Sequence, residues 1–106
     1  MGLDIYIFKA RTKKAFEASS SETIQEVYYA RKFWTLIQEA SFLDVEEDCG
    51  SYIELSRKNI EELIYIATHH EDYFESFDTV PRLCRILADF DEAQEEGYHY
   101  YMEFDY

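Results

Sequence analysis

The acidic turn that begins at Asp44 holds the carboxylates whose spacing best matches a metal site. Asp44, Glu46 and Asp48 alternate along the turn, as the first three oxygen ligands of a calcium-binding loop do. Two later positions of that loop do not match. Cys49 stands where the loop needs glycine for its sharp turn, and Leu55 stands where it needs a bidentate glutamate. The pattern therefore favours an acidic turn between a helix and a strand over a calcium site.

Histidines form the second candidate metal cluster. His69 and His70 are adjacent near the expected end of a helix, and His99 falls in an expected strand. Neighbouring residues on a helix point about 100° apart, so His69 and His70 do not readily share a metal ion. The helix dipole favours positive charge at a C-terminus, and we interpret the pair as helix-end residues. A metal-binding protein that uses the acidic turn or the histidines is an alternative hypothesis, while the main interpretation includes no cofactor.

Motifs for covalent or phosphoryl chemistry are absent from the sequence. The three glycines, Gly2, Gly50 and Gly97, are far apart, which excludes a glycine-rich phosphate loop or a dinucleotide fingerprint. There is no G-x-S-x-G nucleophile elbow. A Cys49–His99 pair would suit nucleophilic catalysis, but nothing in the sequence brings those two residues together. We therefore predict no catalytic residues and a protein that is not an enzyme.

Charge is unevenly distributed along the 106 residues. Residues 41–106 hold eighteen Asp and Glu against four Lys and Arg and carry −14, while residues 1–40 carry +1. A surface this anionic repels nucleic acid and anionic membranes and attracts basic proteins. We therefore expect a basic protein partner, such as a nucleic-acid-binding protein, and neither direct nucleic-acid binding nor membrane binding.

Carboxylates cluster most densely around the last expected helix. Asp89, Glu92 and Glu96 follow one another at i, i+3 and i+7 and so form one row on a helix. A second acidic cluster precedes that helix. The predicted partner-binding residues are Glu71, Asp72, Glu75, Asp78, Asp89, Glu92 and Glu96. Carboxylates about 5.4 Å apart along a helix approach the charge density of duplex phosphates, which favours imitation of DNA toward a basic groove. A solvated acidic face is the simpler interpretation.

The apolar patterns predict the elements that position these residues. Alternation predicts strands at residues 3–8, 51–56 and 98–106. Spacings of three and four predict helices at residues 24–40, 59–68 and 79–96. Residues 9–21 are polar and Ser-rich and predict a loop. The order β-α-β-α-α-β predicts a single α+β domain over residues 1–106, a two-layer fold with a small three-stranded sheet covered by about three helices.

Individual residues in these elements carry further expectations. Cys84 falls on the apolar stripe of the last helix and is expected in the core. Gly97 stands where a left-handed residue ends a helix. On the last strand Tyr100 is expected under the helices, while Tyr101 and Tyr106 are expected at the surface, where tyrosine suits a protein interface. Aromatic strand edges also support a third hypothesis, a structural or oligomerising module.

The N-terminus and the cysteines bear on the compartment. No basic region followed by an apolar leader opens the chain, and no apolar run reaches the length of a membrane span. Cys49 and Cys84 are too few for a secreted disulfide framework. The sequence therefore predicts a cytoplasmic protein.

Two segments resemble a known group of proteins. The start Met1-Gly2-Leu3-Asp4-Ile5-Tyr6 and the segment Glu26-Val27-Tyr28-Tyr29-Ala30-Arg31-Lys32 are similar to the MGLD-x-Y start and the E-V-x-Y-x-R-K segment of small uncharacterised phage and prophage proteins. The resemblance implies a mobile-element context, in which small acidic proteins often bind and inhibit host defence or DNA-handling machinery. It also implies that Tyr28, Tyr29, Arg31 and Lys32, on the first expected helix, are candidates for contact with the host. With the charge distribution, it predicts a non-enzymatic acidic binding protein that acts as an inhibitor or DNA mimic.

Overall fold

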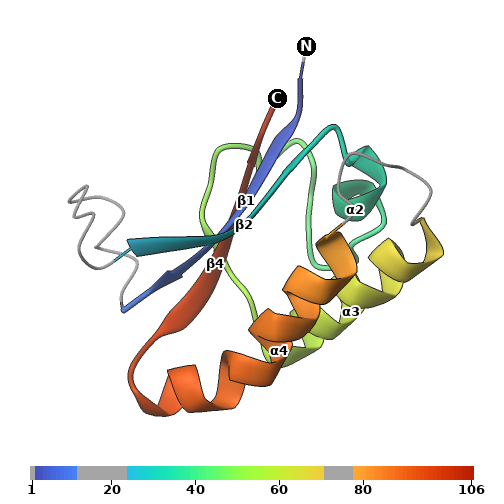
Figure 1. Cartoon of the computed structure of the whole chain (residues 1–106). Coiled ribbons are helices and arrows are strands. Elements are labelled where there is room, and N and C mark those ends of the chain that lie inside the picture. The colour runs from blue at the N-terminus through green and yellow to red at the C-terminus, as the bar shows by residue number, and fades with distance from the viewer. Residues whose placement is uncertain (1, 12–23, 71–77) are drawn as a thin grey trace.

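Strands at the two ends of the chain pair in the centre of one antiparallel sheet. The structure, a computed structural model, describes residues 2–11, 24–70 and 78–106. Within these residues the sheet has four strands in the order β2-β1-β4-β3. Their bounds are β1 Asp4–Ala10, β2 Ile24–Arg31, β3 Ile53–Glu54 and β4 His99–Asp105. The helices α2 (Trp34–Gln38), α3 (Arg57–His69) and α4 (Thr79–Glu95) lie on one side of the sheet (Figure 1).

The prediction of a three-stranded sheet was wrong, although the α+β class agrees with the structure. Residues 24–31 form the edge strand β2 in place of the first half of a helix. The spacing of Ile24, Val27 and Tyr28 looked helical because β2 contains an irregularity. Tyr28 pairs with Ile7 and Glu26 pairs with Phe8, so Val27 is an extra residue without a partner. A bulge of this kind interrupts the period of two that identifies a strand.

Only the end of the predicted 24–40 helix is helical. Lys32 has a positive φ of 59°, and its backbone N–H donates to the Leu3 carbonyl at 2.8 Å. The chain turns there from β2 into α2, whose Leu36 and Ile37 are fully buried. The turn makes room for a short helix that closes one end of the core.

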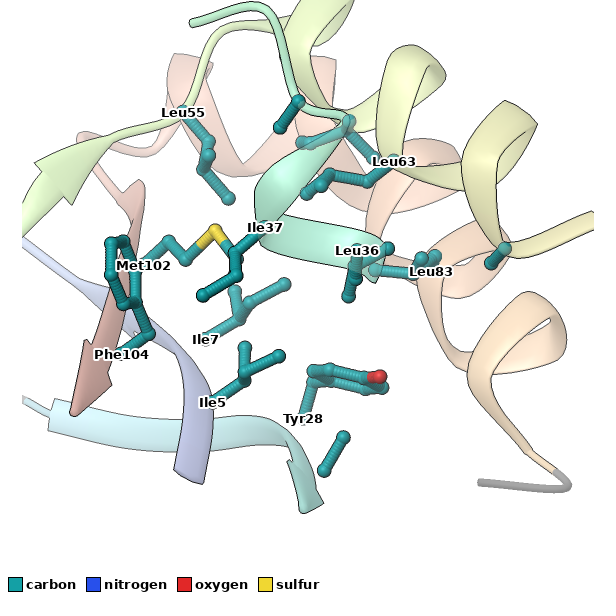
Figure 2. Close-up of a cluster of buried hydrophobic side chains, with 14 of the residues drawn as sticks. Ile5, Ile7, Tyr28, Leu36, Ile37, Leu55, Leu63, Leu83, Met102 and Phe104 are labelled. Carbon is teal, nitrogen blue, oxygen red and sulfur yellow. The ribbon is translucent and has the colours of Figure 1, made fainter. Parts of the chain in front are cut away.

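Aliphatic side chains of the sheet form the core with the helices. Ile5 and Ile7 on β1 are fully buried, and Met102 and Phe104 lie beside them on β4. Figure 2 shows these four side chains pointing toward α2, with residues of α3 and α4 such as Leu83 closing the cluster. Burial of aliphatic surface on one side of each strand fixes which side faces the helices.

The ends of α3 and α4 follow local signals. The Ser56 side chain accepts a hydrogen bond from the Asn59 backbone N–H at 3.1 Å, and the Asn59 side chain accepts one from the Ser56 N–H at 2.9 Å. The helix therefore starts at this capping box, so the prediction of Asn59 as the cap was wrong. Gly97, with φ of 88°, has the left-handed conformation predicted after α4. Cys84 is exposed, contrary to its predicted burial, and Ile86 is buried instead.

Strand and loop boundaries also differ from those predicted. β1 continues to Ala10, where a loop was expected from residue 9. β3 has two residues in place of the predicted strand at 51–56. The rest of the predicted Ser-rich loop lies outside the described residues, except for residue 11.

In the part of the chain that the structure describes, no helix is both long and apolar enough to cross a membrane.

Candidate functional site

The side of the sheet away from the helices carries a second set of side chains. In the described residues no helix lies over it (Figure 1). Nine of the residues that the strand register places there are called the open face, which leaves out Ile24, Ala10 and His99 at one end and Glu54 of β3. These nine residues form three rows across the sheet, Arg31–Asp4–Asp105, Tyr29–Tyr6–Glu103 and Glu26–Phe8–Tyr101.

Carboxylates outnumber cations on the open face. The nine residues include one cation, Arg31, and four carboxylates, those of Asp4, Glu26, Glu103 and Asp105. The Nε atom of Arg31 lies 3.8 Å from a carboxylate oxygen of Asp4, too far for a strong ion pair at an exposed site. Asp4 and Asp105 stand directly opposite each other on neighbouring strands, an arrangement that like-charge repulsion makes unfavourable. The open face is therefore electronegative.

Tyr6 lies at the centre of this electronegative surface. Burial raises its pKa above the ordinary value, and four carboxylates raise it further, those of Asp4, Glu26, Glu103 and Asp105. The field that disfavours a phenolate at this ring favours a cation beside it. The electron-rich face of a tyrosine ring attracts cations as well. The centre of the open face therefore has the chemistry to receive a Lys or Arg side chain.

Tyr29 is held in place beside Tyr6. Their ring centroids are 4.9 Å apart, and the Tyr29 hydroxyl donates to an oxygen of Asp4 at 2.6 Å. That hydrogen bond is the main reason that the pKa of Tyr29 is raised to about 12. Tyr6 also stacks on Phe8, with ring centroids 5.7 Å apart and planes 12° apart. Rings fixed in this way lose little further freedom on binding a partner.

Two tyrosines of the last strand differ in exposure. Tyr101, predicted at the surface, is buried together with Ala10, and Phe8 and Tyr52 pack against this pair. Tyr106 is 40% exposed, as predicted. The residues of the open face that offer accessible aromatic surface therefore centre on Tyr6 and Tyr29.

On the helix side, the sheet becomes polar at one end. Lys9 follows Ile7 on this face and pairs across the strands with Gln25 and Tyr100. The Lys9 Nζ donates to an oxygen of Asp89 on α4 at 2.8 Å, and the Tyr100 hydroxyl donates to the same oxygen. These two hydrogen bonds hold the pKa of Asp89 below its usual range.

A cavity of about 380 Å³ adjoins this polar cluster. It lies between β2 and α4, and its lining includes Lys9, Gln25, Asp89, Arg82 and Arg85. Of the nine lining residues three are cationic (Lys9, Arg82 and Arg85) and two are acidic (Glu26 and Asp89), in a protein with a net charge of −13. The helix side of the sheet therefore carries a basic cavity behind an acidic open face.

The structure describes four of the seven predicted partner-binding carboxylates, and one of the four is bound by other side chains. Glu92 is exposed on α4 and Glu96 is exposed at its C-cap, whereas the Asp89 carboxylate accepts hydrogen bonds from Lys9 and Tyr100. Asp78 is exposed and lies 3.9 Å from Arg82. The other three predicted residues lie outside the described part of the chain, and they are Glu71, Asp72 and Glu75.

The candidate metal residues serve other purposes. Asp44 accepts hydrogen bonds from the backbone N–H groups of Glu46 and Glu47, each at 3.0 Å, and Asp48 accepts one from the Asp44 N–H at 2.8 Å. These carboxylates shape the turn itself. Across residues 2–11, 24–70 and 78–106, no group of three His, Cys, Asp or Glu is placed to hold a metal ion.

The histidines lie in three separate places. His69 Nδ1 is 2.8 Å from the Tyr65 carbonyl oxygen, and His70 Nε2 is 2.8 Å from an oxygen of Glu39. His99 Nδ1 lies 3.3 Å from an oxygen of Glu54. Each histidine is therefore tied to its own neighbour.

The residues implicated by the resemblance all lie on or just after β2. Tyr28 is buried, and its hydroxyl shares a hydrogen bond of 3.0 Å with Thr79. Tyr29, Arg31 and Lys32 are exposed, so they remain available to a partner. The acidic rows around Tyr6 were missed because they depend on the pairing of β1 with β4 and on β2 being a strand. The signal that pointed to them was the alternation of Ile5 and Ile7 with Tyr6.

Comparisons with protein-family models, with curated proteins and with solved structures give no significant match to this chain.

Proposed function

We propose that the protein is a non-enzymatic binding protein whose open face holds a basic segment of a partner protein. The observation that carries this proposal is the central row of the open face, where Tyr29 and Tyr6 lie beside Glu103. Tyrosine offers a large, rigid contact surface at low entropic cost. Carboxylates around the rings add attraction to Lys and Arg and discriminate against acidic partners.

Charge complementarity identifies the partner's chemistry. The net charge of −13 attracts a basic protein from a distance, and the carboxylates of the open face give the attraction a location. An arginine of the partner can lie over the Tyr6 ring while it donates to a carboxylate such as Glu103. By occupying a basic groove of a nucleic-acid-binding protein, the open face would inhibit that partner.

The setting of this interaction follows from the resemblance and from the cysteines. The resemblance to phage and prophage proteins makes a host protein the expected partner. Cys49 and Cys84 are both free thiols, which suits a reducing compartment. The proposal therefore places the interaction in the cytoplasm.

The test is binding of a fluorescent Arg- and Lys-rich peptide, measured by anisotropy at low and at physiological salt. The double variant Glu26→Gln/Glu103→Gln removes two carboxylates that act on Tyr6. We expect it to weaken peptide binding about tenfold, since each exposed charge contact contributes up to about 1 kcal/mol. Tyr6→Ala is expected to weaken binding to a similar degree by removing the ring.

A matched control is available on α4. Glu92→Gln/Glu96→Gln also removes two carboxylates, so its net charge equals that of Glu26→Gln/Glu103→Gln. Both of its residues lie away from the open face. We expect this variant to weaken binding less than about twofold. Equal losses in the two double variants would mean that only the overall charge attracts the peptide, and the proposed site would be wrong. A larger loss in the α4 variant would instead favour the acidic row predicted there.

A further inference from the structure

The cavity between β2 and α4 combines features that the proposed function does not use. It has a volume of about 380 Å³, within the range of about 300–1,000 Å³ that is typical of small-molecule sites. The sheet explains its location. Along β1 the buried apolar Ile7 is followed on the helix side by Lys9, whose side chain is polar. The cavity lies on the helix side of the sheet, and Glu26 is the one residue that it shares with the open face.

The cations of the cavity are placed to bind an anion. Arg82 and Arg85 are three residues apart on α4, and both line the cavity, as neighbours on one helix face do. In the described part of the chain Arg85 forms no ion pair, and Arg82 has only the 3.9 Å contact with Asp78. Lys9 is paired with Asp89, with its Nζ atom 2.8 Å from a carboxylate oxygen. Two guanidinium groups therefore remain available, and their planar donors match the oxygens of a phosphate.

Two carboxylates also line the cavity, and neither cancels the two arginines. Asp89 is neutralised by Lys9 and accepts the Tyr100 hydroxyl. Glu26 stands opposite Phe8 in the strand register, so its side chain belongs to the open face. The charge left in the cavity is therefore positive, against the negative charge of the whole protein.

The remaining lining residues indicate which chemical group, besides the anion, the cavity can accept. Val27 and Ile86 supply apolar surface, and Gln25 supplies an amide. A long polyanion would meet the acidic remainder of the protein, whereas a small molecule fits inside the cavity and avoids that repulsion. We propose that this cavity binds a small organic phosphate monoester, with the phosphate held by Arg82 and Arg85 and the organic group against Val27 and Ile86.

The test uses two probes, phenyl phosphate and adenosine monophosphate, titrated into the full chain and followed by calorimetry and by NMR shifts of α4. We expect binding of at least one probe, and weaker binding of inorganic phosphate and of the same organic group without phosphate. Arg85→Ala should weaken binding of the probe about tenfold, because a charged hydrogen bond is lost. Arg85 is exposed, so the variant should keep the wild-type unfolding midpoint.

Lys58→Ala is the matched control, because it removes an exposed cation from α3 that does not line the cavity. It should leave the affinity for the probe unchanged. The proposal is overturned if neither probe binds at millimolar concentration. It is also overturned if Arg85→Ala and Lys58→Ala weaken binding equally, or if inorganic phosphate binds as tightly as the organic phosphates.

Discussion

The two faces of the sheet are built by the same strands, yet they differ in the side chains that they can accept. On the helix side Ile5 and Ile7 are fully buried. Their aliphatic side chains give up no hydrogen bonds to water when they are buried. On the open face their neighbour Tyr6 keeps its hydroxyl near water and carboxylates. The exceptions support the comparison, because the two buried tyrosines that the strands place on the helix side each have a hydroxyl partner. Tyr28 pairs with Thr79, and Tyr100 donates to Asp89.

Removing an aliphatic side chain from the helix side should have the largest effect. Ile7→Ala is expected to lower the free energy of unfolding by about 2–4 kcal/mol, because it opens a cavity in a fully buried site. Tyr6→Ala, one residue earlier and on the open face, should cost clearly less. Urea denaturation of both variants measures the difference. Similar losses would show that the open face is packed as tightly as the core.

Alkaline pH should act on the helix side through a buried hydroxyl. Burial raises the pKa of Tyr28 to about 12, against about 10 in the unfolded chain. The folded state therefore binds this proton more tightly, so the associated stability is fully present below pH 10. It is lost as the pH rises from about 10 to about 12, up to about 2–3 kcal/mol.

Urea denaturation between pH 9 and pH 12 checks this loss. In Tyr28→Phe the fall in stability should be shallower, whereas the exposed Tyr65 provides a control in Tyr65→Phe. An equally steep fall in Tyr28→Phe and the wild type would assign the alkaline transition to other tyrosines.

At neutral pH the same hydroxyl should have a smaller effect. Tyr28→Phe leaves the buried Thr79 hydroxyl without its partner and should lower the free energy of unfolding by about 1 kcal/mol. Thr79→Val and the double variant complete a thermodynamic cycle. Single losses that simply add would mean that the hydrogen bond contributes nothing beyond the two side chains.

Much of the helix side of the sheet could be predicted from the sequence. The alternation of Ile5 and Ile7 on β1 and of Met102 and Phe104 on β4 predicted two strands and which residues share a face of each, and those faces are buried. Such patterns succeed because burial on one face of a strand imposes a period of two. They failed for residues 24–31, where the extra residue Val27 shifts the period in the middle of the strand.

The candidate site was harder to predict because it depends on pairing between distant strands. Asp4, Glu26 and Glu103 are far apart in the sequence and meet around Tyr6 only through the strand register. In the same way, no local pattern indicates that Lys9 would reach Asp89 across 80 residues. The prediction of a row at Asp89, Glu92 and Glu96 assumed that carboxylates on one helix face form no ion pairs. Asp89 instead pairs with Lys9 of the sheet.

The smallest expected effect concerns a carboxylate of the open face. Burial is the main reason that the pKa of Glu103 is raised above its usual value, and the charge of Asp105 adds to it, while a hydrogen bond with Tyr52 opposes the rise. A raised pKa means that the folded state prefers the protonated form, so this preference stabilises the protein below the unfolded pKa. It is lost as the pH rises through the folded value. At pH 7 the ionised Glu103 therefore costs stability.

Glu103→Gln should raise the thermal midpoint at pH 7 by about 1 °C, and the gain should disappear at pH 4, below the raised pKa, where the wild-type side chain is already protonated. Thermal unfolding at the two pH values measures it, and Glu92→Gln on exposed α4 is the control. The same Glu103→Gln change should weaken binding of a basic peptide. A residue that lowers stability while it supports binding is expected at a functional surface. A variant that is less stable at pH 7 would instead assign Glu103 to the structure of the sheet.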